Sequence, residues 1–252
     1  MSGNRRSLRL ALARAVYRVA FRLGSRLFDL DRFDRSPDVR LFEYGFALEQ
    51  LSRLPAGRVL DLGCTSRGNL LPPALAALGW EVHGVDKRDF KLTHERFHFV
   101  RGDLLSLPFP DHCFDAVCAI STLEHVGVSG RYGVSRADAE GDSAVVAEMK
   151  RVLKPAGCAV VTVPFGRPRV VSGWARIYDA KRIAALLAGW NVDAASYFLR
   201  ERDGTGRLVP LNGLPAGADF QTNEATALLS ATPASVALAP PGAGVSSAAG
   251  VR

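Results

Sequence analysis

The chain has 252 residues, of which 48% are hydrophobic and 23% are charged, so it is long and apolar enough for one large globular domain with extensions. Its formal net charge is +7, but seven arginines and a single acidic residue fall within residues 1–30, and the remainder is close to neutral. This distribution argues against a basic nucleic-acid-binding face on the main domain, so we expect no nucleic-acid partner.

The first segment, residues 1–50, is predicted to be a basic amphipathic helical extension. Arginines recur at every fourth position from Arg14 to Arg26, and the opposite side carries Leu12, Val16, Val19, Leu23 and Leu27. Such a helix either makes peripheral contact with an anionic membrane surface or packs its apolar side on the domain as a lid. The second interpretation is the simpler one.

The cysteines favour a reducing compartment. None belongs to a C-x-x-C pair, so buried reduced thiols are expected at Cys64, Cys113, Cys118 and Cys158. Arginines interrupt the only stretch that resembles the core of a signal peptide, and no apolar stretch approaches the roughly 18 residues of a transmembrane helix. We therefore expect a cytoplasmic protein.

The second segment, residues 51–205, alternates strand-like and helix-like patterns. Strands are predicted over residues 58–62, 81–85, 97–100, 114–120, 158–163 and 192–199. Helices are predicted from Pro72, from a cap at Asp142 to Pro155, and from a cap at Asp179 to Gly189. This alternation predicts an α/β fold with a doubly wound, mainly parallel, Rossmann-like sheet.

The third segment, residues 206–252, is predicted to be largely a low-complexity tail. From Ala225 to Val251 there is no charged or aromatic residue, and no helical or strand period is sustained. We expect this tail to be disordered and dispensable for folding, although a short strand over residues 235–239 is an open alternative.

Small or polar residues follow several predicted strands at their carboxyl ends, where ligands bind in sheets of this kind. They are Asp61 with Gly63, then Asp86, Asp103 and Ser121. An acid at the end of the second strand can accept hydrogen bonds from both hydroxyls of a ribose. An acid after the third can accept a hydrogen bond from an exocyclic amine, and small residues after the first let backbone amides approach a ligand.

Five segments occur in the order and at the spacing of a known family. The chain resembles class I S-adenosylmethionine-dependent methyltransferases over roughly residues 56–200, through the segments VLDLGC (59–64), VHGVD (82–86), GDL (102–104), FDAV (114–117) and E-x-x-RVLKP-x-G (148–157). The resemblance implies S-adenosyl-L-methionine as cofactor and methyl transfer as activity. The cofactor contacts that it implies are Asp61, Gly63, Cys64, Thr65, Arg67, Asp86, Asp103, Leu104 and Ser121.

The resemblance implies that the loop after Asp61 binds the methionine portion of the cofactor, Asp86 the ribose, and Asp103 with Leu104 the adenine. The loop departs from the family pattern Gly-x-Gly-x-Gly, because Thr65 stands where the second glycine is expected. Arg67 then supplies a partner for the cofactor carboxylate.

A narrower resemblance lies in residues 124–133, EHVGVSGRYG, followed by RIY at 176–178. They are similar to a little-characterised subgroup with an E-H-x-G-x-G-R-Y-G type signature, with one extra residue between the two glycines. Members often occur among genes for cell-surface sugars. This association implies a small-molecule or saccharide acceptor that takes the methyl group on a hydroxyl. The candidate substrate contacts are Arg131, Tyr132, Arg176 and Tyr178.

His125 is the candidate catalytic base, because an imidazole can remove a hydroxyl proton as the methyl group moves in line. Glu124 is expected to act with it or to orient it. Two plainer interpretations stay open: His125 bonds to backbone, and the arginines and tyrosines form a satisfied polar cluster.

The remaining histidines show no ligand spacing, so no metal site is expected from His83, His94, His98 or His112. A nicotinamide oxidoreductase would need Gly-x-Gly-x-x-Gly after the first strand, and that pattern is absent. A nucleic-acid amino-methyltransferase would commonly show Pro-Pro-Tyr after the fourth strand, where this chain has Ser121-Thr122-Leu123. A cytosine-C5 enzyme would need a Pro-Cys nucleophile, which the sequence lacks. The alternative that stays open is a non-catalytic, methyltransferase-like binding module.

Overall fold

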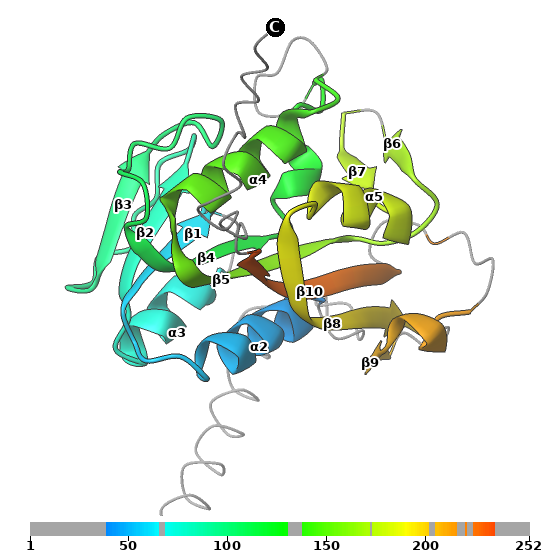
Figure 1. Cartoon of the computed structure of the whole chain (residues 1–252), viewed down its shortest axis with the longest axis horizontal. Coiled ribbons are helices and arrows are strands. Elements are labelled where there is room, and N and C mark those ends of the chain that lie inside the picture. Colours follow the sequence, from blue (N-terminus) through cyan, green and yellow to red (C-terminus); the bar gives the residue numbers. More distant parts are fainter. Residues whose placement is uncertain are drawn as a thin grey trace, which may run out of the picture.

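A computed structural model describes residues 39–65, 69–130, 138–171, 173–201, 205–215, 220 and 224–234 (Figure 1). The predicted basic helix, with Arg14 and Arg26, lies outside these residues, and so does the stretch 235–252. Within the described part of the chain, no helix combines the length and the apolar composition needed to cross a membrane.

The described residues form a central sheet of eight strands. In spatial order they are β3 (Phe97–Arg101), β2 (Glu81–Asp86), β1 (Arg58–Leu62), β4 (Phe114–Ile120), β5 (Leu153–Pro164), β10 (Ala225–Pro233), β8 (Trp190–Arg200) and β9 (Gly206–Val209). The first five are mutually parallel, whereas β10 runs antiparallel to both of its neighbours and β9 runs antiparallel to β8. The predicted doubly wound, mainly parallel sheet is confirmed.

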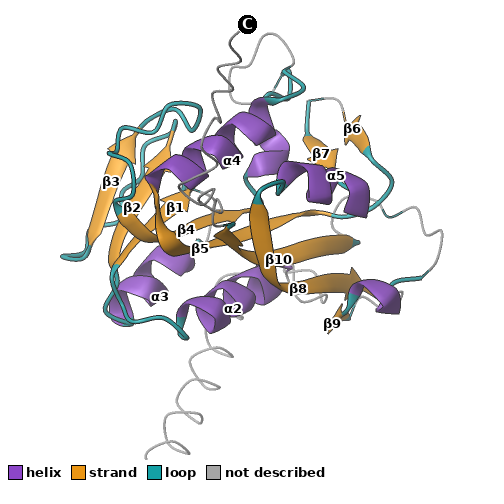
Figure 2. Ribbon diagram, in the orientation of Figure 1, coloured by secondary structure: helices purple, strands orange, loops and turns teal. Residues whose placement is uncertain are grey.

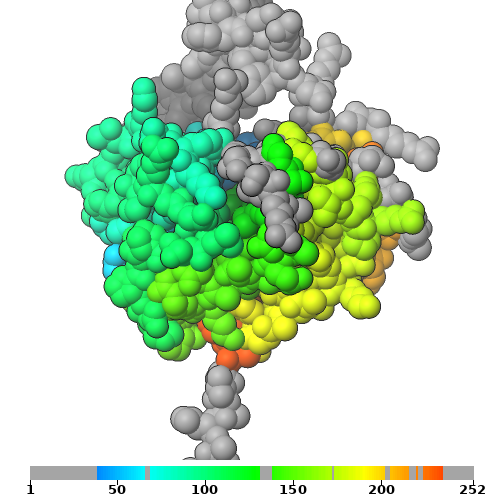
Figure 3. Space-filling view, turned by 90° about the horizontal axis from the view of Figure 1, so that it is seen from above, coloured from blue at the N-terminus to red at the C-terminus, as the bar shows by residue number. Residues whose placement is uncertain are grey.

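Helices cover both faces of this sheet (Figure 2). On one face lie α2 (Val39–Leu51) and α3 (Leu71–Ala77), and on the other lie α4 (Gly141–Val152) and α5 (Ala180–Leu186). Because successive strand residues point to opposite faces, Val59 of β1 packs with the α2 and α3 side, whereas Leu60 packs with the α4 and α5 side. In the space-filling view, the green α4 segment and the yellow α5 segment form a continuous surface (Figure 3).

The predicted tail boundary is wrong at β10. Ala225–Pro233 is a strand between β5 and β8, and its residues from Ala225 to Ala231 are buried. A strand that is covered on both faces needs no alternation of polar and apolar residues, so its run of small apolar side chains resembled low complexity. The domain that the structure describes therefore extends beyond the predicted limits of 51 and 205, from α2 to β10.

The predicted cap at Asp142 is also wrong. Helix α4 begins at Gly141, its N-cap Glu140 makes no side-chain cap bond, and the chain turns into β5 at Leu153, before Pro155. Asp142 is instead fully buried. The predicted cap at Asp179 is confirmed, because its side chain accepts a hydrogen bond from the Arg182 backbone N–H at 2.7 Å.

Two short 3-10 helices and a hairpin complete the described fold. The helix η2 (Leu123–His125) follows β4, η3 (Leu211–Gly213) follows β9, and the hairpin of β6 (Arg169–Val171) and β7 (Ala175–Ile177) follows β5. Because η2 and the hairpin extend beyond the carboxyl ends of β4 and β5, they bring further polar side chains to that edge of the sheet.

Candidate functional site

Asp61 lies near the carboxyl end of β1 and is only 2% exposed. It accepts a hydrogen bond from Asn69 Nδ2 at 3.0 Å, and the same amide group donates to the Cys64 carbonyl at 2.9 Å. Burial raises the pKa of Asp61 to about 7, and the charge of nearby Asp86 acts in the same direction. Sequence reasoning missed Asn69, whose only local signal is its place just before the Pro-Pro start of α3.

The turn after β1 approaches the segment after β4 closely. Gly63 has a φ of +73°, and a Cβ at this position would lie 2.6 Å from Thr122 Oγ1. The Thr122 hydroxyl donates to the Leu62 carbonyl at 2.9 Å. Cys64 is fully buried.

Asp86, the last residue of β2, is 7% exposed and already engages several donors. Its carboxylate accepts hydrogen bonds from Thr65 Oγ1 at 2.6 Å, from the Arg88 backbone N–H at 2.9 Å and from the Arg88 guanidinium at 3.2 Å and 3.3 Å. Burial alone would raise the pKa of Asp86, but these donors outweigh it and hold the pKa below its ordinary value. Arg67 lies outside the described residues.

Asp103 follows β3 on the same edge of the sheet. It accepts a hydrogen bond from the Leu105 backbone N–H at 3.1 Å and forms an ion pair with Lys87 at 3.0 Å. About half of its side-chain surface stays exposed, so it is accessible to a ligand. Leu104 is buried in the core on the α4 side.

Ser121 follows β4 with a φ of +43°, which is uncommon for a residue with a side chain. Its hydroxyl donates to Glu43 of α2 at 2.5 Å, and Thr162 of β5 donates to the same carboxylate oxygen at 2.7 Å. Arg40 pairs with the other oxygen of Glu43 at 3.1 Å. Sequence reasoning missed Glu43, which is fully buried and links α2 to the carboxyl ends of β4 and β5.

The candidate catalytic pair lies together in η2. His125 Nε2 is 3.7 Å from Glu124 Oε1, and both side chains are largely buried. His125 Nδ1 is 2.9 Å from the Trp174 carbonyl oxygen, a contact in which the ring N–H donates. This contact orients the imidazole, as the plainer interpretation of His125 also expected.

Arg176 is 4% exposed and holds the two ends of the segment after η2. It donates to the Val126 carbonyl at 3.0 Å and to the Asp138 carbonyl at 2.9 Å. Tyr178 is fully buried, and its hydroxyl donates to Asp142 at 2.8 Å. The predicted direct substrate contact of Tyr178 is therefore wrong, because its side chain belongs to the core. Arg131 and Tyr132 lie outside the described residues.

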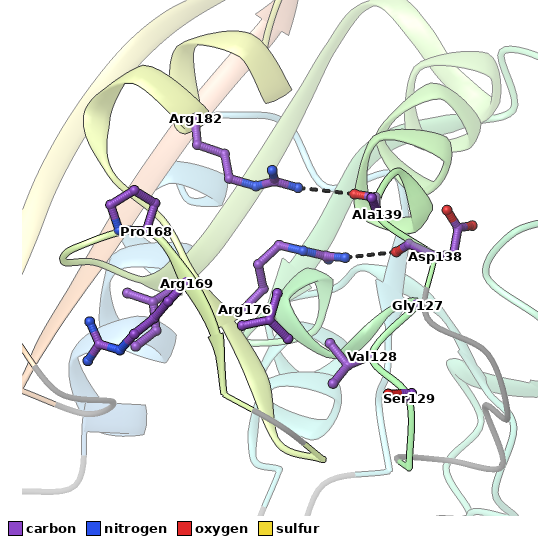
Figure 4. A pocket seen from close by; sticks show the side chains of 11 residues that line it. Gly127, Val128, Ser129, Asp138, Ala139, Pro168, Arg169, Arg176 and Arg182 are labelled. Atoms are coloured by element: carbon purple, nitrogen blue, oxygen red, sulfur yellow. Dashed lines mark hydrogen bonds between the residues drawn. The ribbon is translucent and has the colours of Figure 1, made fainter.

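A pocket of about 390 Å³ adjoins this segment. It lies between the chain that follows η2, the hairpin of β6 and β7, and the start of α5. Its lining residues are Gly127, Val128, Ser129, Asp138, Ala139, Pro168, Arg169, Val170, Arg176, Ile177 and Arg182. Arg176 and Arg182 extend side by side toward the carbonyl oxygens of Asp138 and Ala139 (Figure 4).

Comparison with known proteins agrees with this architecture. Residues 60–161 match the family described as methyltransferase domain. The chain is 30% identical to sterol 24-C-methyltransferase ERG6B of Gibberella zeae over 114 residues, which are 41% of this chain and 26% of that enzyme. It is 30% identical to cycloartenol-C-24-methyltransferase of Arabidopsis thaliana over 131 residues, 48% of this chain and 34% of that enzyme. The chain thus spans about a third or less of these relatives.

Among solved structures, the chain is similar to the 1,6-didemethyltoxoflavin-N1-methyltransferase of Burkholderia thailandensis, determined with S-adenosylhomocysteine. The TM-score is 0.56 at 18% identity, covering 89% of this chain and 90% of that one. This likeness shows the fold. The match over residues 60–161 and this fold agree with the methyltransferase domain that the sequence predicts.

Proposed function

We propose that this protein is an S-adenosylmethionine-dependent methyltransferase with a small-molecule acceptor. The observation that carries the proposal is the shared position of Asp61, Asp86, Asp103 and Ser121. They lie at or just after the carboxyl ends of four neighbouring parallel strands, where ligands bind in folds of this class.

The donor and acceptor chemistry of these residues fits the cofactor. Asp86 accepts hydrogen bonds from the ribose hydroxyls, and these replace the hydrogen bonds from the Arg88 guanidinium. The exposed carboxylate of Asp103 accepts a hydrogen bond from the adenine amine. The turn from Gly63 to Thr65 lies beside Asp86 at the same edge of the sheet and is the proposed position of the methionine portion, whose cationic end faces Asp61. The backbone N–H groups of Gly63 and Thr65 already donate to the Val85 carbonyl and to Asp86. When bound, the cofactor supplies an electrophilic methyl group.

Acceptor binding is assigned to the pocket beside η2. Its lining includes Arg169, Arg176 and Arg182, whose guanidinium groups can donate hydrogen bonds to the oxygens of a hydroxylated acceptor. The curated relatives are named for sterol substrates and the solved enzyme for a toxoflavin precursor, which supports a small molecule. The narrower sequence resemblance favours a saccharide hydroxyl, and His125 accepts its proton.

The ribose assignment has a direct test in calorimetric titration of the parent protein with S-adenosylhomocysteine. Asp86→Ala should weaken binding about ten- to a hundredfold, because charge-assisted hydrogen bonds are lost. Asp89→Ala, at an exposed carboxylate three residues away that pairs with Arg101, is the matched control and should bind like the parent. Equal affinity in Asp86→Ala and the parent would refute the assignment.

One observation favours the second candidate, a non-catalytic binding module. The guanidinium of Arg88 occupies Asp86, the residue assigned to the ribose. If the cofactor displaces this ion pair, Arg88→Ala should bind S-adenosylhomocysteine at least as tightly as the parent. No binding by either protein would favour the module.

Three expectations about the surroundings of the protein stay predictions of the proposal. They are a cytoplasmic location, the absence of a nucleic-acid partner, and peripheral membrane contact through the N-terminal helix as the alternative to a lid.

A further inference from the structure

Two histidines and a glutamate from two neighbouring strands come together on the outer part of the sheet. His83 of β2 is directly paired with His98 of the edge strand β3. Glu81 lies two residues before His83 on the same strand, so their side chains share one face. The register of two parallel strands therefore creates a group that the spacing in the sequence does not reveal.

The three side chains offer one ligand atom each, and these atoms all lie within 4.8 Å of one another. The imidazole rings have centroids 5.0 Å apart, and Glu81 Oε1 is already in contact with His98 Nε2. Glu81 and His83 are partly buried and His98 is exposed, so the group is open to solvent on one side.

Two imidazoles and one carboxylate are a donor set that zinc uses in proteins, at about 2.0–2.2 Å from each ligand atom. Tetrahedral geometry then places the ligand atoms about 3.3 Å apart, which small rotations of these side chains reach.

We propose that Glu81, His83 and His98 form a zinc site with a fourth position open to water. The site joins β2 to the edge strand β3 and is separate from the proposed cofactor site. Glu81 opens β2 whereas Asp86 closes it, and five residues of strand span roughly 16 Å. The proposal does not depend on methyltransferase activity.

Arg58 competes with the metal ion in this arrangement. Its Nη2 atom lies 3.4 Å from His83 Nε2, and its guanidinium lies over the ring of Phe114. The other hydrogen bond of this guanidinium is to the Cys113 carbonyl at 3.4 Å, on the exposed surface. Zinc binding requires the arginine to turn away from His83, so removal of its charge should strengthen binding.

Calorimetric titration of the metal-free, full-length protein with zinc chloride tests the site. We expect one zinc ion per chain, at least tenfold weaker binding in His98→Gln and in Glu81→Gln, and tighter binding in Arg58→Gln. His94→Gln is the matched control at a nearby exposed histidine and should bind like the parent.

Each variant is compared with the parent by circular dichroism and thermal unfolding without zinc, which separates loss of the site from loss of the fold. Zinc should raise the melting temperature of the parent and of His94→Gln, but not that of His98→Gln. No zinc binding by the parent, or equal affinity in the parent, His98→Gln and Glu81→Gln, would overturn the proposal.

Discussion

The carboxyl group of Asp61 has its pKa raised from 3.8 to about 7 because it is removed from water, with Asn69 as its hydrogen-bond donor. An amide at this position would fill the same space without the cost of ionisation. The cost is explained if a cationic ligand faces Asp61, because the ligand would stabilise the carboxylate that burial destabilises.

The pH dependence of stability tests this interpretation. The pKa of Asp61 is higher in the folded state than in the unfolded state. Its contribution to the stability of the fold is therefore fully present below about pH 4 and is lost as the pH rises through about 7. Asp61→Asn removes this titration. The unfolding free energy of the variant, relative to that of the parent, should therefore rise by roughly 4 kcal/mol between pH 4 and pH 8. Urea unfolding at both pH values measures the gain, and parallel pH profiles would contradict the assignment.

The same residue should couple cofactor binding to pH. Cofactor that faces ionised Asp61 binds more tightly as the pH rises through about 7, whereas Asp61→Asn should show a flat profile over that range. Calorimetry with S-adenosylmethionine at pH 6 and pH 8 gives both values.

His125 is the residue on which the proposed mechanism depends. If it accepts the proton of a hydroxyl, His125→Ala should lower turnover by about a hundred- to ten-thousandfold while affinity for S-adenosylhomocysteine stays unchanged. His94→Ala is the control. Full turnover in His125→Ala would leave alignment of acceptor and methyl group as the mechanism.

At the scale of elements, α2 is fixed to the sheet by a polar contact in its middle. Glu43 accepts hydrogen bonds from Ser121 after β4 and from Thr162 in β5, and it pairs with Arg40 of its own helix. The helix therefore covers the site edge in a defined position, and its position is coupled to the strained backbone of Ser121.

Replacement of Glu43 should destabilise the protein much more than replacement of an exposed glutamate on the same helix. Glu43→Ala leaves the Ser121 hydroxyl, the buried Thr162 hydroxyl and Arg40 without this acceptor, and we expect the unfolding free energy measured in urea to fall by about 3 kcal/mol. Glu49 pairs with Arg53 in an exposed i, i+4 contact, so Glu49→Ala should cost less than about 0.5 kcal/mol. Similar losses in the two variants would show that the contact does not fix α2.

At the scale of the whole molecule, the sequence predicted what local pattern determines. The strands β1 and β4 are short, largely buried and mainly apolar runs, and the cap at Asp179 is a local hydrogen bond, so both could be predicted. Glu43 with Ser121, and His83 with His98, meet only through the packing or register of distant segments, for which a single sequence carries no local signal.

The largest miss, β10, gives the last prediction. The strand pairs with β5 on one side and with β8 on the other, and Leu228 at its centre is fully buried. Removal of residues 225–252 takes away both ladders and separates β8 and β9 from the rest of the sheet, so cooperative thermal unfolding should be lost. Removal of residues 235–252 is the matched control. The difference in melting temperature between the two truncated proteins measures how much residues 225–234, which contain β10, stabilise the fold.

A point substitution makes the same test within the intact chain. Leu228→Ala should lower the unfolding free energy by about 2–5 kcal/mol, since it leaves a cavity in a well-packed layer. Leu208 of the edge strand β9 is exposed, and Leu208→Ala should have little effect. Equal melting temperatures for the two truncations, together with a neutral Leu228→Ala, would mean that β10 is not part of the stable sheet and would restore the tail boundary predicted from composition.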